Sequence, residues 1–257
     1  MSKELDVAVK AAKAAGKVLL KHFETRGGKQ VAKSEFDFVT EADKAAEDVI
    51  ISAIRAEFPG HSILSEEIGS IDNGSEYKWV IDPLDGTKNF GFGVPLWGVS
   101  IGLEKSGEII AGVIFLPVTG EIFTAEKGKG AFLDGKRIRV SSNKFPKCMI
   151  SFGGHWAFSE EPLVKDNFYP VYQKFHQYFR ITGSAVLVLS YIAAGRLDAY
   201  PCFRESPWDV AAGILLIKEA GGIATDIYGN EATPYQKHYI FANNRALYEE
   251  IRKVLKV

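Results

Sequence analysis

The chain has 257 residues, of which 46% are hydrophobic and 25% are charged, and its net charge is −1. This length allows one large domain or two modest ones with a substantial core. The balanced charge lacks the positive field of a nucleic-acid-binding domain, and no apolar run is long enough for a transmembrane helix. The charged N-terminal segment indicates an amphipathic helix and not a signal peptide. We therefore expect a protein that binds neither nucleic acid nor membrane.

The cysteines and histidines narrow the location and the kind of metal. Cys148 and Cys202 are the only two cysteines, too few for a disulfide scaffold, so we expect a cytoplasmic protein. The five histidines are scattered, without an H-x-x-x-H or C-x-x-C pair, so a zinc site is not expected. Any bound metal would need oxygen ligands, which favours Mg²⁺ or a similar hard cation.

The first half of the chain mixes helices and strands. Helical spacing of apolar residues predicts an N-terminal helix and a second helix over 41–58, which ends before Pro59 and Gly60. β-favouring runs then predict short strands, with hairpin turns at Ser106-Gly107 and Asp134-Gly135. The expected strand regions are 62–67, 78–82, 97–117 and 121–141.

From about residue 146, predicted strands and helices alternate. The helix over 160–179 is expected to be interrupted near Pro170. The other predicted elements are strands at 151–154, 179–182 and 197–203 and helices at 184–195 and 207–222. The pattern predicts a mixed α+β fold of the α/β class, with an α+β half over 1–145 and an α/β half over 146–257. No linker separates the halves, so we expect one continuous catalytic unit.

The stretch "WVIDPLDGTKNF", residues 79–90, carries the strongest chemical signal. It places Asp82 and Asp85 where an apolar strand is expected to end. Pro83 and Gly86 restrict the backbone around them, so the two carboxylates keep one geometry. A rigid carboxylate pair favours a divalent cation, because two negative charges held together are costly without one. Leu84 could ligate only through its carbonyl oxygen, and a turn that is acidic by chance is the alternative.

The residues that follow suggest phosphoryl chemistry. Gly86 and Thr87 begin a short helical turn, whose free N–H groups suit a phosphate. A competing interpretation is the D-x-D-G-T motif of phosphatases that use an aspartate nucleophile. Here the spacing is D-x-x-D-G-T, one residue longer, which would turn the second carboxylate away from that arrangement.

Three further carboxylates have structural explanations when each is taken alone. Glu66, in the Glu66-Glu67 pair, could be a solvated turn residue. Asp209, in the first turn of the helix over 207–222, could simply complement the helix dipole. Asp43 could complete a variant of a capping box at the start of the helix over 41–58.

Taken together, these segments resemble the inositol monophosphatase family, which are magnesium-dependent, lithium-sensitive sugar phosphatases. The resemblance implies a layered αβαβα sandwich that is usually dimeric, so a homodimer is expected. It covers nearly the whole chain, because the motifs occur in the order of the family and at suitable separations. They are "DFVTEAD" (37–43), "SEE" (65–67), "WVIDPLDGTKNF" (79–90), "GSA" (183–185) and "PWDVAAGILLIKEAGG" (207–222).

The resemblance also implies a set of metal ligands, carried over position by position. One Mg²⁺ would be held by Glu66, Asp82 and the carbonyl of Leu84. A second would be held by Asp82, Asp85 and Asp209, with Asp82 shared by both ions. A third, weaker ion near Glu66 is also implied, so the expected cofactor is two or three Mg²⁺ ions. Two neighbouring ions can stabilise both the attacking and the leaving oxygen.

The catalytic roles follow from the same resemblance. A metal-activated water, oriented by Glu66 and the Thr87 hydroxyl, would attack phosphorus directly, and Asp43 would accept a hydrogen bond from Thr87. The amides of Gly86 and Thr87 would hold phosphate oxygens. In relatives the corner formed here by Gly183, Ser184 and Ala185 contacts the substrate, and Asp209 is also placed there. A tight strand-to-helix turn explains Gly183 equally well.

The sequence departs from the family pattern on the substrate side. Relatives often place a glutamate that binds a ring hydroxyl seven residues before the second-motif aspartate, and here that position is Cys202. Glu205 is nearby, but its direction is open. Arg204 could bind a second phosphate, and a surface salt bridge is the alternative.

These observations lead to one expected function and several alternatives. We expect a Mg²⁺-dependent phosphomonoesterase that hydrolyses inositol monophosphate to inositol and phosphate. A fructose-1,6-bisphosphatase, with or without dual activity, or a 3′-phosphonucleotide phosphatase would use the same chemistry. A binding module that keeps the fold without turnover is the alternative from another class.

Overall fold

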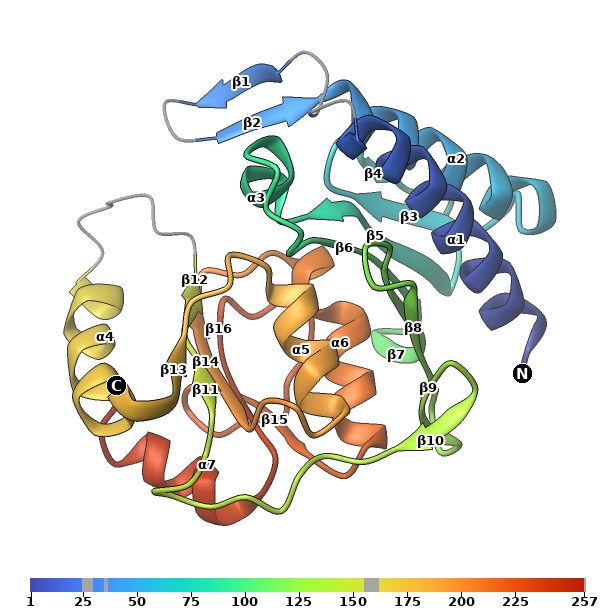
Figure 1. Cartoon of the computed structure of the whole chain (residues 1–257). Helices are drawn as coiled ribbons and strands as arrows, with labels where there is room; N and C mark the ends of the chain where they lie inside the picture. Colours follow the sequence, from blue (N-terminus) through green and yellow to red (C-terminus); the bar gives the residue numbers. More distant parts are fainter. Residues whose placement is uncertain (25–29, 35–36, 155–161, 257) are drawn as a thin grey trace.

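The computed structural model describes residues 1–24, 30–34, 37–154 and 162–256, and its elements form five layers (Figure 1). Helices α1 and α2 cover one face of the first sheet, α5 and α6 lie between the two sheets, and α4 and α7 lie outside the second sheet. This arrangement confirms the predicted αβαβα sandwich. The helices are α1 (Lys3–Glu24), α2 (Glu41–Glu57), α3 (Thr87–Gly91), α4 (Pro162–Phe175), α5 (Ala185–Ala193), α6 (Pro207–Glu219) and α7 (Arg245–Arg252).

The first sheet has eight strands in the order β10-β9-β8-β7-β6-β5-β3-β4, and all neighbours are antiparallel except the parallel pair β3 and β5. Both predicted hairpin turns, Ser106-Gly107 and Asp134-Gly135, are present with positive φ angles. The strands are β3 (Ser62–Ser65), β4 (Gly69–Ile71), β5 (Tyr77–Asp85), β6 (Gly98–Lys105), β7 (Glu108–Leu116), β8 (Glu121–Glu126), β9 (Gly130–Leu133) and β10 (Lys136–Ile138).

The second sheet follows the order β13-β11-β14-β16-β15, and β12 also pairs with β14. Its strands come from the second half of the chain, whereas those of the first sheet come from 62–138. The proposed division of the chain at residue 145 remains a prediction. The strands are β11 (Ile150–Ser151), β12 (Gly153–Gly154), β13 (Phe179–Arg180), β14 (Ala199–Phe203), β15 (Ile223–Asp226) and β16 (His238–Ala242).

Helix α6 packs very close to the first sheet. Its residues from Asp209 to Ile217 are all buried, as expected for a helix enclosed on every side. A Cβ atom added to Gly102 would lie 3.0 Å from Ala211, and one added to Gly112 would lie 3.1 Å from the backbone of Ala212. The two glycines therefore let the helix approach the sheet, so its N-terminus lies beside β5 and β6.

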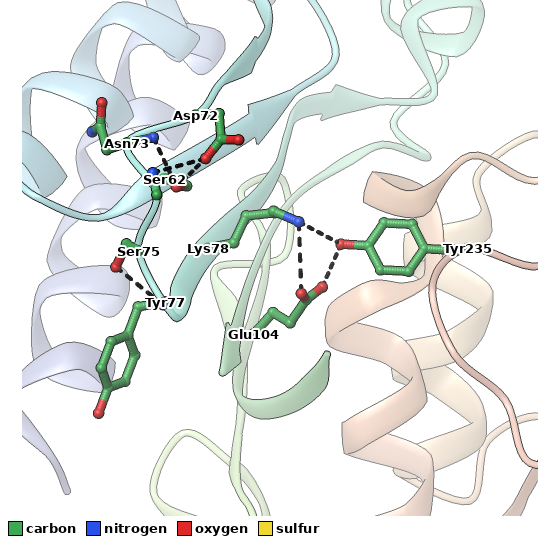
Figure 2. A network of polar contacts seen from close by, with 9 residues as sticks. Ser62, Asp72, Asn73, Ser75, Tyr77, Lys78, Glu104 and Tyr235 are labelled. Carbon is green, nitrogen blue, oxygen red and sulfur yellow. Dashed lines mark hydrogen bonds and ion pairs between the residues drawn. The ribbon is translucent and has the colours of Figure 1, made fainter. Parts of the chain in front are cut away.

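The start of β5 is tied to the second half of the chain by a polar network (Figure 2). The Lys78 ammonium lies 3.3 Å from the hydroxyl of Tyr235 and 3.7 Å from Glu104. The Tyr235 hydroxyl in turn donates to the buried Glu104. Lys78 and Glu104 belong to β5 and β6, while Tyr235 comes from the loop between β15 and β16. The network thus fixes β5 at the end opposite the acidic motif.

Helix α4 and the β1–β2 ribbon differ from the sequence prediction. The prediction that α4 is interrupted near Pro170 is wrong, because the helix runs continuously from Pro162 to Phe175. Pro170 cannot donate to the carbonyl of Asp166, but Asp166 is exposed, so water can satisfy that group. The ribbon formed by β1 (Gln30–Ser34) and β2 (Asp37–Thr40) was not predicted. No helix in the described part of the chain has both the length and the apolar character needed to cross a membrane.

Candidate active site

A β-bulge places the two aspartates of the central motif. Asp82 pairs with Ser100 of β6 and Asp85 pairs with Gly98, so β5 carries one residue more than β6 between these pairs. Pro83 lies in this interval and has no N–H to offer to the ladder, which favours a bulge at that point. Bulges change the direction of the side chains around them. The expectation that the strand ends at Asp82 is therefore wrong: β5 continues through Asp85.

Glu66 is brought beside Asp82 by parallel strand pairing. Ser65, the last residue of β3, pairs with Ile81 of β5. The Glu66 N–H continues this pairing and donates to the Ile81 carbonyl at 3.3 Å. Because Asp82 directly follows Ile81, Glu66, which comes just after β3, lies beside Asp82 of β5. Asp82 is 1% exposed and accepts a hydrogen bond from the Leu84 N–H at 2.9 Å.

Asp85 is held by the N-terminus of α5. Its carboxylate accepts hydrogen bonds from the Ser184 hydroxyl and, at 2.9 Å, from the Val186 N–H. Ser184 is also the N-cap of α5 and accepts the Leu187 N–H at 3.1 Å. The expected substrate contact Ser184 thus has a clear structural task, which is to orient Asp85.

Asp209 joins the two other aspartates across the interface between α6 and the first sheet. The Ser100 hydroxyl of β6 donates to the Trp208 carbonyl at 3.2 Å, and this contact holds the start of α6 against the strand that pairs with Asp82. The Asp209 carboxylate accepts the Ser206 N–H at 2.7 Å, so its capping role is present too. Oxygens of Asp82, Asp85 and Asp209 lie within 4.8 Å of one another. We call these three residues and Glu66 the acid cluster.

The carboxylates of the acid cluster repel one another when they are ionised. Burial raises the pKa of Asp82 well above its usual range, and the nearby Glu66, Asp85 and Asp209 raise it further. Burial likewise raises the pKa of Asp85 to about 6, although hydrogen bonds from Ser184 and Val186 oppose this shift. The pKa of Asp209 is also raised well above its usual range by burial and by neighbouring carboxylates. A cation would remove this repulsion.

The donor set fits a hard divalent cation. Its side chains offer carboxylate oxygens, the ligands that Mg²⁺ prefers. The carbonyl of Leu84 faces the same region, because it accepts the Thr87 hydroxyl at 3.1 Å. The structure thus places all five expected metal ligands on the same short stretch of sheet edge and the adjoining helix N-terminus.

Thr87 and Asp43 form a second polar pair beside the acid cluster. The Thr87 hydroxyl lies 3.3 Å from Oδ1 of Asp43, a residue of α2 that is 1% exposed. A hydroxyl has one hydrogen to donate, so Asp43 and the Leu84 carbonyl compete for the hydrogen of Thr87. Gly86 precedes α3 with a φ of 87°, and a Cβ there would lie 2.8 Å from the Leu96 carbonyl. Glycine is therefore required at this position on both grounds.

The acid cluster, Gly86 and Thr87 line one cavity of about 560 Å³. Its lining comes from residues 66–88 and from residues 152–209. Gly183, with a φ of 74°, lies at its edge and packs close to the side chain of Asn89. The predicted site residues that line the cavity are Glu66, Asp82, Leu84, Asp85, Gly86, Thr87, Gly183, Ser184, Ala185 and Asp209.

The loop between β14 and α6, residues 204–206, supplies an acidic residue whose direction the sequence left open. Glu205 lines the cavity, is 8% exposed and accepts the Tyr200 hydroxyl at 3.0 Å. Burial raises its pKa to about 7. Cys202, at the usual glutamate position of the family, is fully buried.

Arg204 differs from Glu205 in its placement. It is half-buried and is not among the residues that line the cavity. Its φ is 62°, and its backbone N–H donates to Nδ1 of His238 at 3.3 Å. This left-handed conformation redirects the chain between Phe203 and Glu205, and no pattern of residue types would have indicated it, because Arg rarely adopts positive φ.

The fold and site define a layered α/β protein with a buried carboxylate site suited to metal-assisted phosphate chemistry, and comparison with known proteins agrees. The model of the inositol monophosphatase family matches residues 1–256. The chain is 37% identical over 252 residues to the fructose-1,6-bisphosphatase/inositol-1-monophosphatase of Thermotoga maritima, a match that covers 98% of this chain and 95% of that protein.

Two further comparisons extend this likeness. The chain is 38% identical over 258 residues to the Nus factor SuhB of Pasteurella multocida, covering 99% of this chain and 96% of that protein. The crystal structure of the extragenic suppressor protein suhB from Bartonella henselae matches with a TM-score of 0.91 at 35% identity, covering 99% of both chains. The chain belongs to the inositol monophosphatase family. It is thus a phosphoric monoester hydrolase of a generally metal-dependent family.

Proposed function

We propose that the protein is a Mg²⁺-dependent phosphomonoesterase that hydrolyses inositol monophosphate to inositol and phosphate by direct attack of water on phosphorus. The observation that carries this proposal is the acid cluster, in which Glu66, Asp82, Asp85 and Asp209 line one cavity although they come from different parts of the chain. The Thr87–Asp43 pair lies beside it at 3.3 Å. A cation site next to a proton-accepting pair is what hydrolysis of a phosphate ester needs.

Two or three Mg²⁺ ions would be held by this chain's own oxygens. Glu66, Asp82 and the Leu84 carbonyl would hold one ion, and Asp82, Asp85 and Asp209 would hold another. Bound Mg²⁺ supplies positive charge that acidifies the attacking water and stabilises charge on the phosphoryl and leaving oxygens. The pKa values of Asp82 and Asp209 are raised by burial and by neighbouring carboxylates. Such a buried group of acids supports the assignment, because a cation would stabilise its ionised form.

Thr87 and Asp43 would handle the proton of the attacking water. The Thr87 hydroxyl would donate to Asp43, whose Oδ1 lies 3.3 Å away. Its oxygen can then accept a hydrogen bond from the water, and Glu66 would orient the same water. The burial of Asp43, 1% exposed, strengthens this hydrogen bond because the local dielectric is low.

The substrate would enter between α3 and the N-terminus of α5. The amides of Gly86 and Thr87 would donate to phosphate oxygens, and Gly183, Ser184 and Ala185 would form the adjoining surface. We place the leaving group against the β14–α6 loop, since Glu205 faces the cavity there. Ser184 would serve the substrate indirectly, because its hydroxyl is engaged by Asp85.

A second candidate function is hydrolysis of fructose 1,6-bisphosphate, alone or as a dual activity. The replacement of the usual glutamate by Cys202 favours it, and the T. maritima relative is named for both activities. Arg204 would then bind the second phosphate after its side chain moves toward the cavity. A 3′-phosphonucleotide phosphatase would use the same acid cluster. A silent binding module is disfavoured, because no ligand of the acid cluster is missing.

The test is release of inorganic phosphate, with and without Mg²⁺, from inositol 1-phosphate, fructose 1,6-bisphosphate and 3′-phosphoadenosine 5′-phosphate. We expect Mg²⁺-dependent release that is fastest from inositol 1-phosphate. A preference for the bisphosphate that is lost in Arg204→Ala would establish the second candidate instead. That substitution keeps a Cβ at a position with positive φ, so it does not change the backbone strain. Absence of metal-dependent release from all three substrates would reject the enzyme.

We also propose a homodimer in the cytoplasm, as the family resemblance and the two free, buried cysteines suggest. Light scattering after size-exclusion chromatography tests the dimer: a mass of one chain at working concentration would contradict it.

A further inference from the structure

Helix α2 presents two buried acidic residues to the active site, and only one of them has a role in the proposed reaction. Asp43 and Glu47 lie one helical turn apart, on the same face of α2. They are 1% and 2% exposed. Neither residue lines the cavity itself, but Asp43 faces Thr87, which does. Burying an acidic group is costly unless it is well hydrogen-bonded, so the partners of Glu47 indicate what it does.

Among the described residues, the hydrogen bonds of Glu47 go to the segment that carries Glu66. Its Oε1 atom accepts the Ser65 hydroxyl, the Glu67 N–H at 3.1 Å and the Ile68 N–H at 3.2 Å. These donors come from the residues on either side of Glu66. No Lys or Arg side chain of the described residues pairs with Glu47, so the polar contacts seen for this buried carboxylate are those with the Ser65–Ile68 turn.

We propose that Glu47 is a positioning residue, which fixes the turn at Ser65–Ile68 and so holds the Glu66 carboxylate beside Asp82. The opposite side of the turn is fixed by the Glu66 N–H, which donates to the Ile81 carbonyl at 3.3 Å. Glu66 is thus held between β5 on one side and α2 on the other. Helix α2 then positions a residue on each side of the acid cluster. It holds Thr87 through Asp43 and Glu66 through Glu47.

This inference rests on the proposed role of Glu66 as a metal ligand, so its test measures metal binding and not turnover. The probe is Mn²⁺ alone, with free ion measured by electron paramagnetic resonance in the absence of substrate. We expect Glu47→Gln to weaken Mn²⁺ binding about tenfold to a hundredfold, the effect typical of groups that orient a ligand. Gln keeps the shape of Glu but is a weaker acceptor for three donors.

A double variant shows whether Glu47 acts through Glu66. If it does, Glu47→Gln combined with Glu66→Gln binds Mn²⁺ no more weakly than Glu66→Gln alone. Full multiplication of the two single effects would overturn the inference. So would wild-type binding in Glu47→Gln. Ser65→Ala removes one of the three donors and is expected to give a smaller loss, which tests the inference even if Glu47→Gln fails to fold.

Asp226 provides a matched control. It is 7% exposed, ends strand β15, and holds the following turn through the Tyr228 N–H at 2.9 Å and the Asn230 N–H at 2.8 Å. It lies outside the cavity. Asp226→Asn should bind Mn²⁺ like the wild type. If it lost as much Mn²⁺ affinity as Glu47→Gln, the effect of Glu47→Gln would be explained by general destabilisation, and the inference would be overturned. Wild-type protein that binds Mn²⁺ but hydrolyses none of the three phosphate esters would reject the proposed function and not the role of Glu47.

Discussion

The two sides of the cavity are built in different ways. On the metal side, Asp85 accepts hydrogen bonds from the N-terminus of α5, and the Glu66 N–H donates to Ile81 of β5. Asp82 and Asp209 accept N–H groups of nearby residues in their own segments, Leu84 and Ser206. On the other side, Glu205 accepts the Tyr200 hydroxyl at 3.0 Å, and its direction depends on the left-handed residue before it, Arg204, with a φ of 62°. The metal side depends on motifs of fixed spacing, whereas the other side depends on one backbone conformation. The type of reaction is therefore better determined by the sequence than the choice of substrate.

The largest effect is expected from Asp82→Asn, on the metal side. Asp82 is shared by both proposed ions, so its loss should lower kcat/KM about a thousandfold or more, in line with the several kcal/mol that metal ions contribute to such reactions. Mg²⁺-dependent phosphate release measures it. The metal-free variant should unfold at the same temperature as the wild type or higher, because one repelling charge has been removed. Activity within tenfold of the wild type would contradict the shared-ligand assignment.

Asp43→Asn should have the next largest effect, and it should separate proton handling from metal binding. Asn still fills the site but accepts the Thr87 hydroxyl more weakly, so we expect kcat to fall roughly a hundredfold. The Mg²⁺ concentration for half-maximal rate should stay near that of the wild type. Single-turnover and steady-state kinetics across a Mg²⁺ series distinguish the two. Near-normal turnover in a folded variant would reject the role of Asp43.

The hairpins and the separate acidic motifs were accessible from the sequence because each depends on short-range signals. The hairpins at Ser106-Gly107 and Asp134-Gly135 use residues that tolerate positive φ, and the structure has both. Asp82 and Asp85 are three residues apart, but Glu66 and Asp209 come from other segments of the chain. Only the family resemblance joined all four, and implied the layered sandwich, before the structure did.

Other features depend on contacts that no local pattern contains. The bulge at Pro83 arises from the register between β5 and β6, so it appeared in the sequence as a turn. The continuation of α4 through Pro170 depends on the exposure of Asp166 to water. The inward direction of Glu205 depends on Arg204 adopting a conformation that its residue type disfavours.

Glu205→Gln should give a smaller effect that depends on the substrate. If Glu205 accepts a hydroxyl of the leaving group, its loss should lower kcat/KM about tenfold for inositol 1-phosphate, the usual scale for one hydrogen bond to a charged group. An aryl phosphate without hydroxyl groups should be hydrolysed as by the wild type. Equal losses for the two substrates would instead place Glu205 with the acid cluster, and the contrast between the two sides of the cavity would fail.

The smallest expected effect is on thermal stability. Its dependence on pH distinguishes the metal side of the cavity from the side formed by the β14–α6 loop. Burial raises the pKa of Asp85 from 3.8 to about 6 and that of Glu205 from 4.5 to about 7. A raised pKa means that the folded state holds the proton more tightly, so this contribution to stability is present at about pH 4 and is lost as the pH rises toward 7. Mg²⁺ offsets the loss only where the carboxylates are ionised. We therefore expect Mg²⁺ to raise Tm by several °C more at pH 8 than at pH 5. Differential scanning calorimetry measures the difference, with Asp82→Asn expected to reduce it and Glu205→Gln to leave most of it. A Mg²⁺ effect on Tm that does not vary with pH would mean that the cation does not bind the ionised acid cluster.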